Sequence, residues 1–521
     1  MKKALEARSR TGAALWIMSG LLLEFLALSA CTTSPATGKL VPSFNSQLEE
    51  KRIGQRQHAK IVKEFGGVYK NPKVTNYVQA LGNRLAAASE LPGIGWTFTV
   101  LNSDQINAFA IPGGFTYVTR GLMALAENEA ELAGVIAHEI GHVTALHSSA
   151  RQAGGFYAGL GAMAAGLFLG RAGAEAGNYL SRGLLQSYSR DQEFEADSLG
   201  VRYLSRTGYN TQAMASFLTK MRANTQLQNK ILGRPENQVD QYSFFASHPR
   251  TTDRVTRAIR EASITQSGTR LGKVDYMEIM EGMIYGDDPD QGVIRGREFI
   301  HPALWFSFSV PEEFRLINNP RSVLASGPEG ATIQFDMDFK PHKSSMAKYL
   351  REVWAAKARL SSVERITVNG MDGATGATQV RRRDGIFDLR FVAIRQNSQR
   401  IFRMLFITPK RLTNHLSASL QRTTFSMRTI SAQEAAAIKP WRINIRPVRA
   451  GDTVARFTQQ MAVNNFKEET FRVLNGLGPN DRLRTGQLVK IVTDQPHARS
   501  GLDQLIPLRP QGDKRIGAPI R

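Results

Sequence analysis

Six residues, 137–142 with the sequence AHEIGH, constrain this chain more than any other feature. Side chains four residues apart lie on the same face of an α-helix, so His138 and His142 can reach one metal ion. Glu139, beside the first histidine, carries the carboxylate that acts on water at such a site. The spacing therefore predicts a zinc site with His138 and His142 as ligands and Glu139 as general base.

The helix that carries this motif is expected to lie inside the protein. Apolar residues recur around the motif at spacings of three and four, the period of a helix with one buried face: Leu132, Val135, Ile136, Ile140, Val143 and Leu146. An unpaired imidazole would be costly in such surroundings. This context favours a metal site over a chance occurrence of the pattern on a solvated helix.

A second acidic motif offers the remaining ligand. A catalytic zinc ion usually has three protein ligands, which leaves a fourth position open. In the run 189–197, Glu193 and Asp197 are four residues apart and share a helical face. We expect Glu193 to be the third ligand and Asp197 to fix the tautomer of a ligating histidine. Glu195 points elsewhere and is expected to be a solvated charge. Taken alone, Glu193 and Asp197 fit an acidic surface patch better than a metal site, and it is the first motif that favours the metal.

Four motifs occur in an order that is typical of one peptidase family. They are the segments 107–114 (NAFAIPGG), 119–122 (TRGL), 138–142 and 193–197. From about residue 54 to 254 the chain therefore resembles the HtpX-like and BepA-like zinc metallopeptidases of bacterial envelopes, which are gluzincins. The resemblance implies one Zn²⁺ per chain, bound by His138, His142 and Glu193, and an endopeptidase that acts on misfolded or unassembled envelope proteins.

Two further histidines lie near these motifs. His248 precedes Pro249, which favours a loop, and lone histidines are more often structural than ligating. The family carries a similar His-Pro segment with a downstream arginine, which implies that His248 approaches the metal. It would then occupy the open position in a resting form or hydrogen-bond the oxyanion in the working form. His147, five residues beyond His142, lies off the ligand face and is expected to be structural.

The N-terminus has the pattern of an export signal. A basic head precedes an apolar run, 13–30, that is interrupted by Glu24 and is too short for a comfortable membrane span. The sequence LSAC at 28–31 resembles the lipoprotein cleavage box, which predicts lipid attachment at Cys31, the only cysteine of the chain. The alternative is an ordinary signal with an incidental cysteine. Because Thr32 follows the cysteine where Asp often marks inner-membrane retention, the family analogy favours a periplasmic protein anchored to the outer membrane.

The sequence predicts an α+β chain of several domains, since 521 residues are too many for one core. We expect a mainly helical zincin-type peptidase domain with a small sheet, a second α+β domain and a small C-terminal βααβ module. The predicted boundaries are a signal at 1–30, a flexible tether at 31–53, the peptidase at 54–265, a linker at 266–297, the second domain at 298–432, the module at 443–492 and a basic tail at 493–521.

Short strands are predicted around 96–100, 106–111 and 115–119, next to the zinc helix. A free strand edge there can pair with an extended substrate backbone, and we expect the segment 107–108 to provide it. The alternative is that these strands only cover the helix. The glycine-rich apolar run 154–170 is expected to form a buried hairpin or a lid over the cleft.

The last segment resembles the lysin motif (LysM). The resemblance rests on 448–453, 473–477 and 483–491 and implies binding to the glycan of peptidoglycan. A degenerate copy would serve only as a protein contact. The formal net charge of +22 does not require nucleic acid, because an exported protein meets acidic headgroups, lipopolysaccharide and wall polymer instead.

Three classes of function therefore fit the sequence. An envelope endopeptidase predicts zinc-dependent cleavage of unfolded protein. A peptidoglycan-bound hydrolase, suggested by the last segment, predicts release of muropeptides. A chaperone-like binding protein with a vestigial site predicts activity that does not depend on Glu139. The family resemblance favours the first class.

Overall fold

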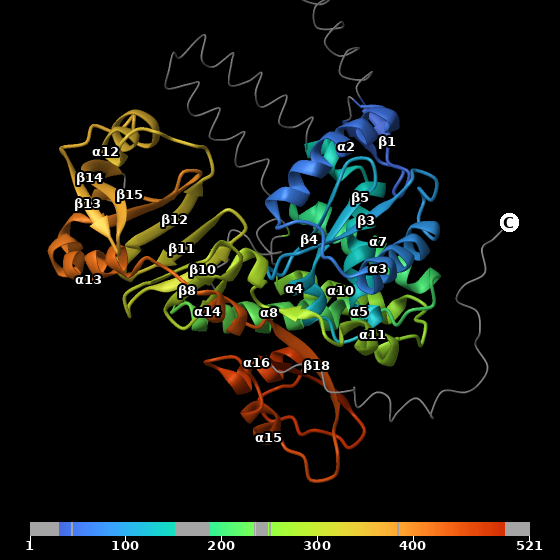
Figure 1. The fold of residues 1–521 in the computed structure, drawn as a ribbon. Coiled ribbons are helices and arrows are strands. Elements are labelled where there is room, and N and C mark those ends of the chain that lie inside the picture. The colour runs from blue at the N-terminus through green and yellow to red at the C-terminus, as the bar shows by residue number, and fades with distance from the viewer. Residues whose placement is uncertain are drawn as a thin grey trace, which may run out of the picture.

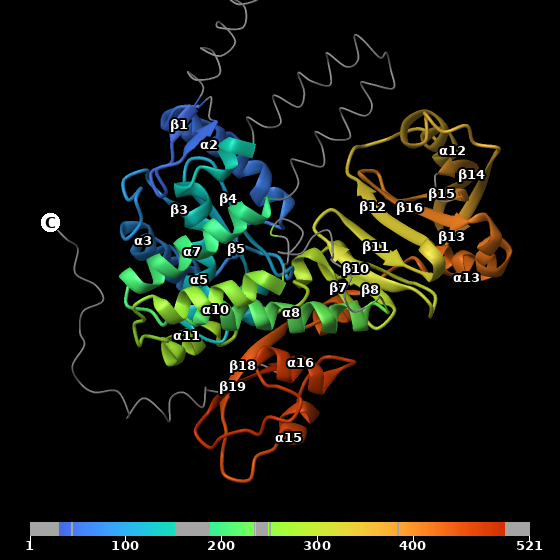
Figure 2. The same ribbon diagram turned by 180° about the vertical axis from the view of Figure 1, so that it is seen from behind.

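The computed structural model describes residues 31–42, 45–151, 188–233, 235, 248, 252–382 and 385–494. The predicted signal at 1–30, the glycine-rich run 154–170 and most of the predicted basic tail lie outside these residues. Figures 1 and 2 show three lobes: a peptidase region, a second lobe of residues 293–429 and a C-terminal module of residues 441–493. Within the described part of the chain, no helix has the length and apolar character needed to cross a membrane.

The peptidase region packs helices around a small three-stranded sheet, as the sequence predicts. The strands are β3 (Thr97–Leu101), β4 (Ala108–Ile111) and β5 (Phe115–Thr119), in the order β3-β5-β4, with β4 antiparallel at an edge. The helices are α2 (Gln47–Glu64), α3 (Pro72–Ala87), α4 (Arg120–Leu125), α5 (Glu129–Thr144), α7 (Arg190–Arg206), α8 (Ala213–Ile231), α10 (Thr252–Ile264) and α11 (Lys273–Met280). The largest apolar core of the described residues lies among them.

Helix α5, which carries the AHEIGH motif, is central to that core. Asn128 caps its first turn by accepting from the Glu131 amide, and every residue from Glu129 to Thr144 is buried. Helix α7 starts with a capping box between Ser189 and Gln192. The two caps fix where each helix begins, and thereby which residues face the neighbouring helix.

Two glycines allow α5 and α7 to approach closely. A Cβ on Gly141 of α5 would lie 3.1 Å from the Ala196 carbonyl oxygen, and one on Gly200 of α7 would lie 3.2 Å from the His138 amide nitrogen. Both distances are shorter than ordinary van der Waals contact. The backbones of the two helices therefore meet at positions where a side chain does not fit.

The segment 31–53 was predicted to be a flexible tether, but its described residues, 31–42 and 45–53, form strands and the start of a helix that pack on the rest of the chain. Strands β1 (Cys31–Thr33) and β2 (Leu40–Pro42) form a hairpin, and α2 already begins at Gln47. The Ser34 hydroxyl donates to the Thr144 carbonyl over 3.3 Å, at the end of α5. The hairpin lies beside α2 (Figure 1), so it is part of the peptidase region.

The second lobe is mainly antiparallel sheet. Its seven-stranded sheet has the order β10-β11-β12-β16-β15-β14-β13, and its four-stranded sheet has the order β17-β9-β8-β7. The strands are β7 (Val293–Arg295), β8 (Glu298–His301), β9 (Phe306–Ser309), β10 (Arg315–Asn319), β11 (Ser322–Ser326), β12 (Thr332–Asp338), β13 (Ser362–Val368), β14 (Met371–Arg382), β15 (Gly385–Asn397), β16 (Arg400–Pro409) and β17 (Arg428–Thr429), with the helices α12 (Met346–Tyr349), α13 (Thr413–Ser426) and α14 (Ala432–Ala437). An aromatic core of its own, including Phe306, Phe335 and Phe402, holds this lobe together.

The C-terminal module has the element order βααβ. It consists of β18 (Trp441–Pro447), α15 (Val454–Gln459), α16 (Lys467–Leu474) and β19 (Leu488–Thr493), and β18 also pairs with β6 (Ile284–Tyr285). The buried Lys490 ammonium donates to the carbonyls of Ala124 and Ala126 over 2.5 and 2.8 Å, at the end of α4. The module is therefore packed directly against the peptidase region.

Candidate metal centre

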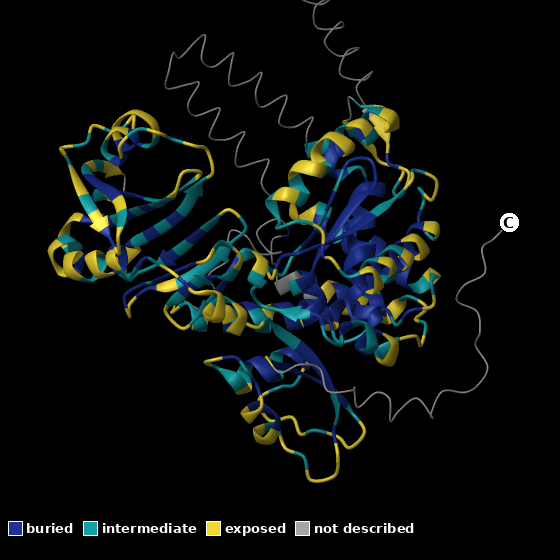
Figure 3. Ribbon diagram, viewed as in Figure 1, coloured by how far each residue is buried: buried dark blue, intermediate teal, exposed yellow. Residues whose placement is uncertain are grey.

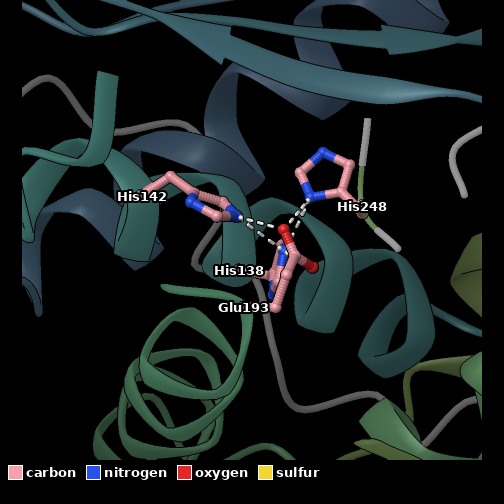
Figure 4. Close-up of side chains that lie close together, drawn as sticks. All are labelled: His138, His142, Glu193 and His248. Atoms are coloured by element: carbon pink, nitrogen blue, oxygen red, sulfur yellow. Dashed lines mark hydrogen bonds and ion pairs between the residues drawn. The ribbon is translucent and has the colours of Figure 1, made fainter. Parts of the chain in front are cut away.

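Four side chains converge between α5 and α7 (Figure 4). They are His138 and His142 from α5, Glu193 from α7, and His248, which lies outside the regular elements. Their nearest ligand atoms all lie within 4.8 Å of one another, and all four residues are buried. The structure thus brings together the three residues predicted to bind metal, His138, His142 and Glu193, and it places His248 beside them.

The spacing of these atoms suits a tetrahedral zinc ion. Zn–N and Zn–O bonds of about 2.0–2.1 Å place neighbouring ligand atoms roughly 3.3 Å apart. The His138 Nε2 atom lies 3.0 Å from His142 Nε2 and 3.3 Å from His248 Nδ1. A Glu193 oxygen lies 3.4 Å from His142 Nε2 and 2.9 Å from His248 Nδ1. Nitrogen and carboxylate donors at these distances fit zinc, and the residues present can hold it.

Glu139 lies beside the four donors without belonging to them. Its side chain is completely buried, and an oxygen of its carboxylate lies 3.5 Å from His248 Nε2. Burial raises the pKa of this carboxyl. A buried carboxylate one residue from a ligand is held where a proton from water at the centre can be received.

Asp197 lies against the outer nitrogen of His138, at the distance that its predicted role requires. The His138 Nδ1 atom donates to an Asp197 oxygen over 2.9 Å, which leaves Nε2 free to bind metal. Arg254 of α10 donates twice to Asp197, both over 2.8 Å, and its guanidinium lies 2.5 Å from Glu193. Burial would raise the pKa of Glu193, but His248, His142 and Arg254 lower it well below its ordinary value. Both carboxylates are therefore kept ionised inside the core.

The outer partner of His142 was missed in the sequence. His142 Nδ1 and His147 Nδ1 lie 2.8 Å apart, and His147 Nε2 lies 2.9 Å from an oxygen of Glu195. The expectation that Glu195 is a solvated charge is wrong, because its side chain is only 18% exposed and also pairs with Lys39 over 2.6 Å. Helix α5 ends at Thr144, and Leu146 has a φ of 60° that turns the chain back, which helical spacing does not foresee.

Tyr188 covers the outer side of the centre. Its ring stacks on His142 with a centroid distance of 3.8 Å and an interplanar angle of 19°, and its hydroxyl lies 3.1 Å from the Ser148 hydroxyl. This stacking contact holds the plane of the imidazole. Each ligating histidine is therefore fixed by at least one neighbour that is not itself a donor to the centre.

Comparison with known proteins agrees with this arrangement. Residues 72–262, which include all the residues of the centre, match the family described as Peptidase family M48. The chain carries an M48 peptidase domain. The predicted resemblance of this region to the bacterial HtpX-like and BepA-like peptidases is thereby confirmed.

Several named proteins resemble the M48 domain. The beta-barrel assembly-enhancing protease of Yersinia pestis is 31% identical over 221 residues, which cover 40% of this chain and 43% of that protein. The protein of the same name from Escherichia coli K12 is 31% identical over 200 residues, covering 36% and 41%. The mitochondrial metalloendopeptidase OMA1 of Schizosaccharomyces pombe is 28% identical over 215 residues, covering 40% and 59%. The matched part of this chain spans less than half the length of the two bacterial relatives.

Proposed function

We propose that this chain is a zinc-dependent metalloendopeptidase of the bacterial cell envelope that cleaves misfolded or unassembled envelope proteins. The observation that carries the proposal is the convergence of His138, His142 and Glu193, with the buried Glu139 beside them. The names of the bacterial relatives, beta-barrel assembly-enhancing proteases, support the envelope as the place of action.

The roles of the residues follow from their positions. Zinc bound at this centre would lower the pKa of a coordinated water toward neutrality and polarise the scissile carbonyl. His138, His142 and Glu193 hold the ion, and Asp197 keeps His138 Nδ1 protonated. Glu139 takes the proton of the attacking water and returns it to the departing amine.

His248 gives this centre a fourth donor. A catalytic zinc site keeps one position open, whereas four protein donors are typical of a closed structural site. His248 Nδ1 lies within 3.3 Å of His138 Nε2 and within 2.9 Å of Glu193, inside the donor set. This geometry favours a resting form in which His248 occupies the fourth position and must leave it before turnover. Hydrogen bonding to the oxyanion is the alternative role.

Substrate would bind along β4. This strand lies at the edge of its sheet, next to β5, and packs against α5. Main-chain hydrogen bonds to a strand edge need an extended backbone and no particular side chain. Such binding suits clients that are unfolded, and it suits the proposed breadth of substrate.

Two further parts of the chain support an envelope location. Lipid at Cys31 would anchor the protein to the outer membrane through the hairpin that Cys31 begins. The βααβ order of residues 441–493 supports the resemblance of 443–492 to the lysin motif, and with it an additional contact to peptidoglycan. Both are proposals separate from catalysis.

Replacing Glu139 by glutamine tests the catalytic role. The variant should bind one zinc ion per chain like the wild type, because Glu139 is not among the donors, and should lose about 10²–10⁴-fold in turnover of casein. The matched control is Glu313→Gln, which removes an exposed carboxylate in the second lobe and should leave turnover unchanged. Turnover by Glu139→Gln within tenfold of the wild type would refute the proposal and favour a chaperone-like protein. Release of muropeptides in place of peptides would favour the wall hydrolase.

A further inference from the structure

Helix α2 presents a stripe of basic side chains to solvent. Arg52, Arg56, Lys60 and Lys63 follow one another at spacings of four, four and three, so they lie on one helical face, and all four are exposed. Figure 3 shows exposed residues along the outer side of α2. The opposite side of the helix packs tightly on the Phe115 ring, so tightly that a Cβ on Gly54 would collide with it. The stripe therefore faces outward in a set orientation.

Little acidic charge on this face offsets the stripe. Among the ion pairs of the described residues, Glu49 lies 3.6 Å from Arg52 and 3.2 Å from Arg56, and it is shared between them. Among the described residues, no ion pair involves Lys60 or Lys63. The face thus keeps a net positive charge over about three turns of helix.

Two leucines extend the stripe at its beginning. Leu48 precedes Arg52 by one helical turn and is 63% exposed, and Leu40 of the adjoining hairpin is 70% exposed. A single exposed leucine is ordinary on a protein surface. An exposed leucine one turn before a basic stripe, with a second exposed leucine in the hairpin beside the same helix, fits an element that lies on a membrane surface, with apolar tips below the headgroups and basic groups among them.

The hairpin also contains the proposed point of lipid attachment. Cys31 pairs with Pro42, and Leu40 pairs with Thr33, so all four residues lie within one two-stranded element. A lipid on Cys31 would hold this element at the bilayer.

We propose that the outer face of α2 and the β1–β2 hairpin dock on the anionic headgroups of a phospholipid bilayer. The docking face consists of Leu40, Leu48, Arg52, Arg56, Lys60 and Lys63. It holds the peptidase region in one orientation, and because α2 packs on the turn between β4 and β5, it keeps the edge of β4 close to the membrane. Clients that are being assembled at the membrane are then the ones presented to the centre. The docking itself does not depend on proteolysis.

The test uses full-length mature protein without lipid, in which Cys31→Ser prevents attachment. Co-sedimentation is measured with vesicles of phosphatidylethanolamine and phosphatidylglycerol and with neutral phosphatidylcholine vesicles. The stripe variant is Arg52→Gln/Arg56→Gln/Lys60→Gln/Lys63→Gln. The control variant, Lys343→Gln/Lys348→Gln/Arg351→Gln/Lys357→Gln, removes the same charge from exposed positions of the second lobe.

The wild type and the control variant should bind the anionic vesicles, and the stripe variant should bind them at least about tenfold more weakly, since each basic residue near such a surface contributes about fivefold. Leu40→Ser/Leu48→Ser should also weaken binding severalfold. Casein turnover in solution should be unchanged in all these variants, which separates this result from a failure of the peptidase proposal. Equal weakening in the stripe and control variants, equal binding to neutral vesicles, or no vesicle binding by the wild type would overturn the docking proposal.

Discussion

Replacing Gly141 by alanine tests whether the close approach of α5 and α7 sets the metal centre. A Cβ at this position would lie 3.1 Å from the Ala196 carbonyl oxygen and 3.2 Å from the Leu199 Cβ. One of these atoms is a backbone oxygen and the other is a Cβ, so neither can move away by a side-chain rotation. The two helices must therefore separate by a few tenths of an ångström, which moves Glu193 away from the histidines.

The expected cost combines two opposing contributions. Overpacking of a tight contact costs about 1–3 kcal/mol, and alanine in place of glycine within a helix returns about 1 kcal/mol. The difference is a net loss of roughly 0–2 kcal/mol, and its midpoint of about 1 kcal/mol, expressed at the donor atoms, corresponds to roughly fivefold weaker zinc binding. Turnover at limiting zinc should fall in the same proportion.

Competition with a chromogenic chelator measures the zinc Kd, and thermal unfolding of the zinc-free protein measures the packing cost. Gly134→Ala is the matched control on the same helix, because its Cβ would lie 3.5 Å from the nearest atom, Met214 Cα, in ordinary contact. This variant should bind zinc like the wild type and be slightly more stable. Unchanged zinc binding by Gly141→Ala, or equal loss in both variants, would refute the reasoning.

Four other substitutions probe three separate features. His248→Ala should retain zinc and raise casein turnover severalfold because the fourth position is opened; abolished turnover would favour the oxyanion role, and unchanged turnover would exclude both. Glu195→Ala should weaken zinc binding about tenfold by releasing His147, and Lys39→Ala should change it much less because Lys39 is 69% exposed; equal effects would contradict this order. Burial and a nearby arginine lower the pKa of His301 to about 4. Because the unfolded chain then binds the proton more tightly, stability should fall by roughly 3 kcal/mol as the pH drops from 6.5 to 4. Urea unfolding of His301→Phe should lack this loss, and the same slope in both proteins would show another cause.

The centre was predictable where its chemistry follows helical periodicity. His138, Glu139 and His142 occupy one helix, and Glu193 and Asp197 occupy another, so the spacing alone assigns each a face. What the spacing does not contain is the distance between the helices, which depends on glycines that allow close contact. The mixed α and β composition of the fold was also predictable, because strand and helix patterns alternate clearly along the chain.

The features that escaped prediction depend on changes of chain direction and on distant contacts. His147 reaches His142 only because Leu146 takes a left-handed conformation. Glu195 is partly buried because it contacts His147 and Lys39, and Lys39 is 156 residues away in sequence. The β1–β2 hairpin lies in a segment that was predicted to be a tether from its Thr, Ser, Pro and Gly content. Composition alone did not reveal that this segment has a surface to pack against.

The attachment of the C-terminal module has a consequence for how this protein can be taken apart. Ile443, Ile445 and Leu488 of the module belong to the same apolar core as Ile136 of the zinc helix. A chain truncated before residue 441 would expose that core to water. The carbonyls of Ala124 and Ala126 would also lose the hydrogen-bond donor that Lys490 provides. The peptidase region is therefore not expected to fold stably without the C-terminal module. Because the module is packed rigidly against the peptidase region, any ligand bound to the module would hold the metal centre in a fixed orientation.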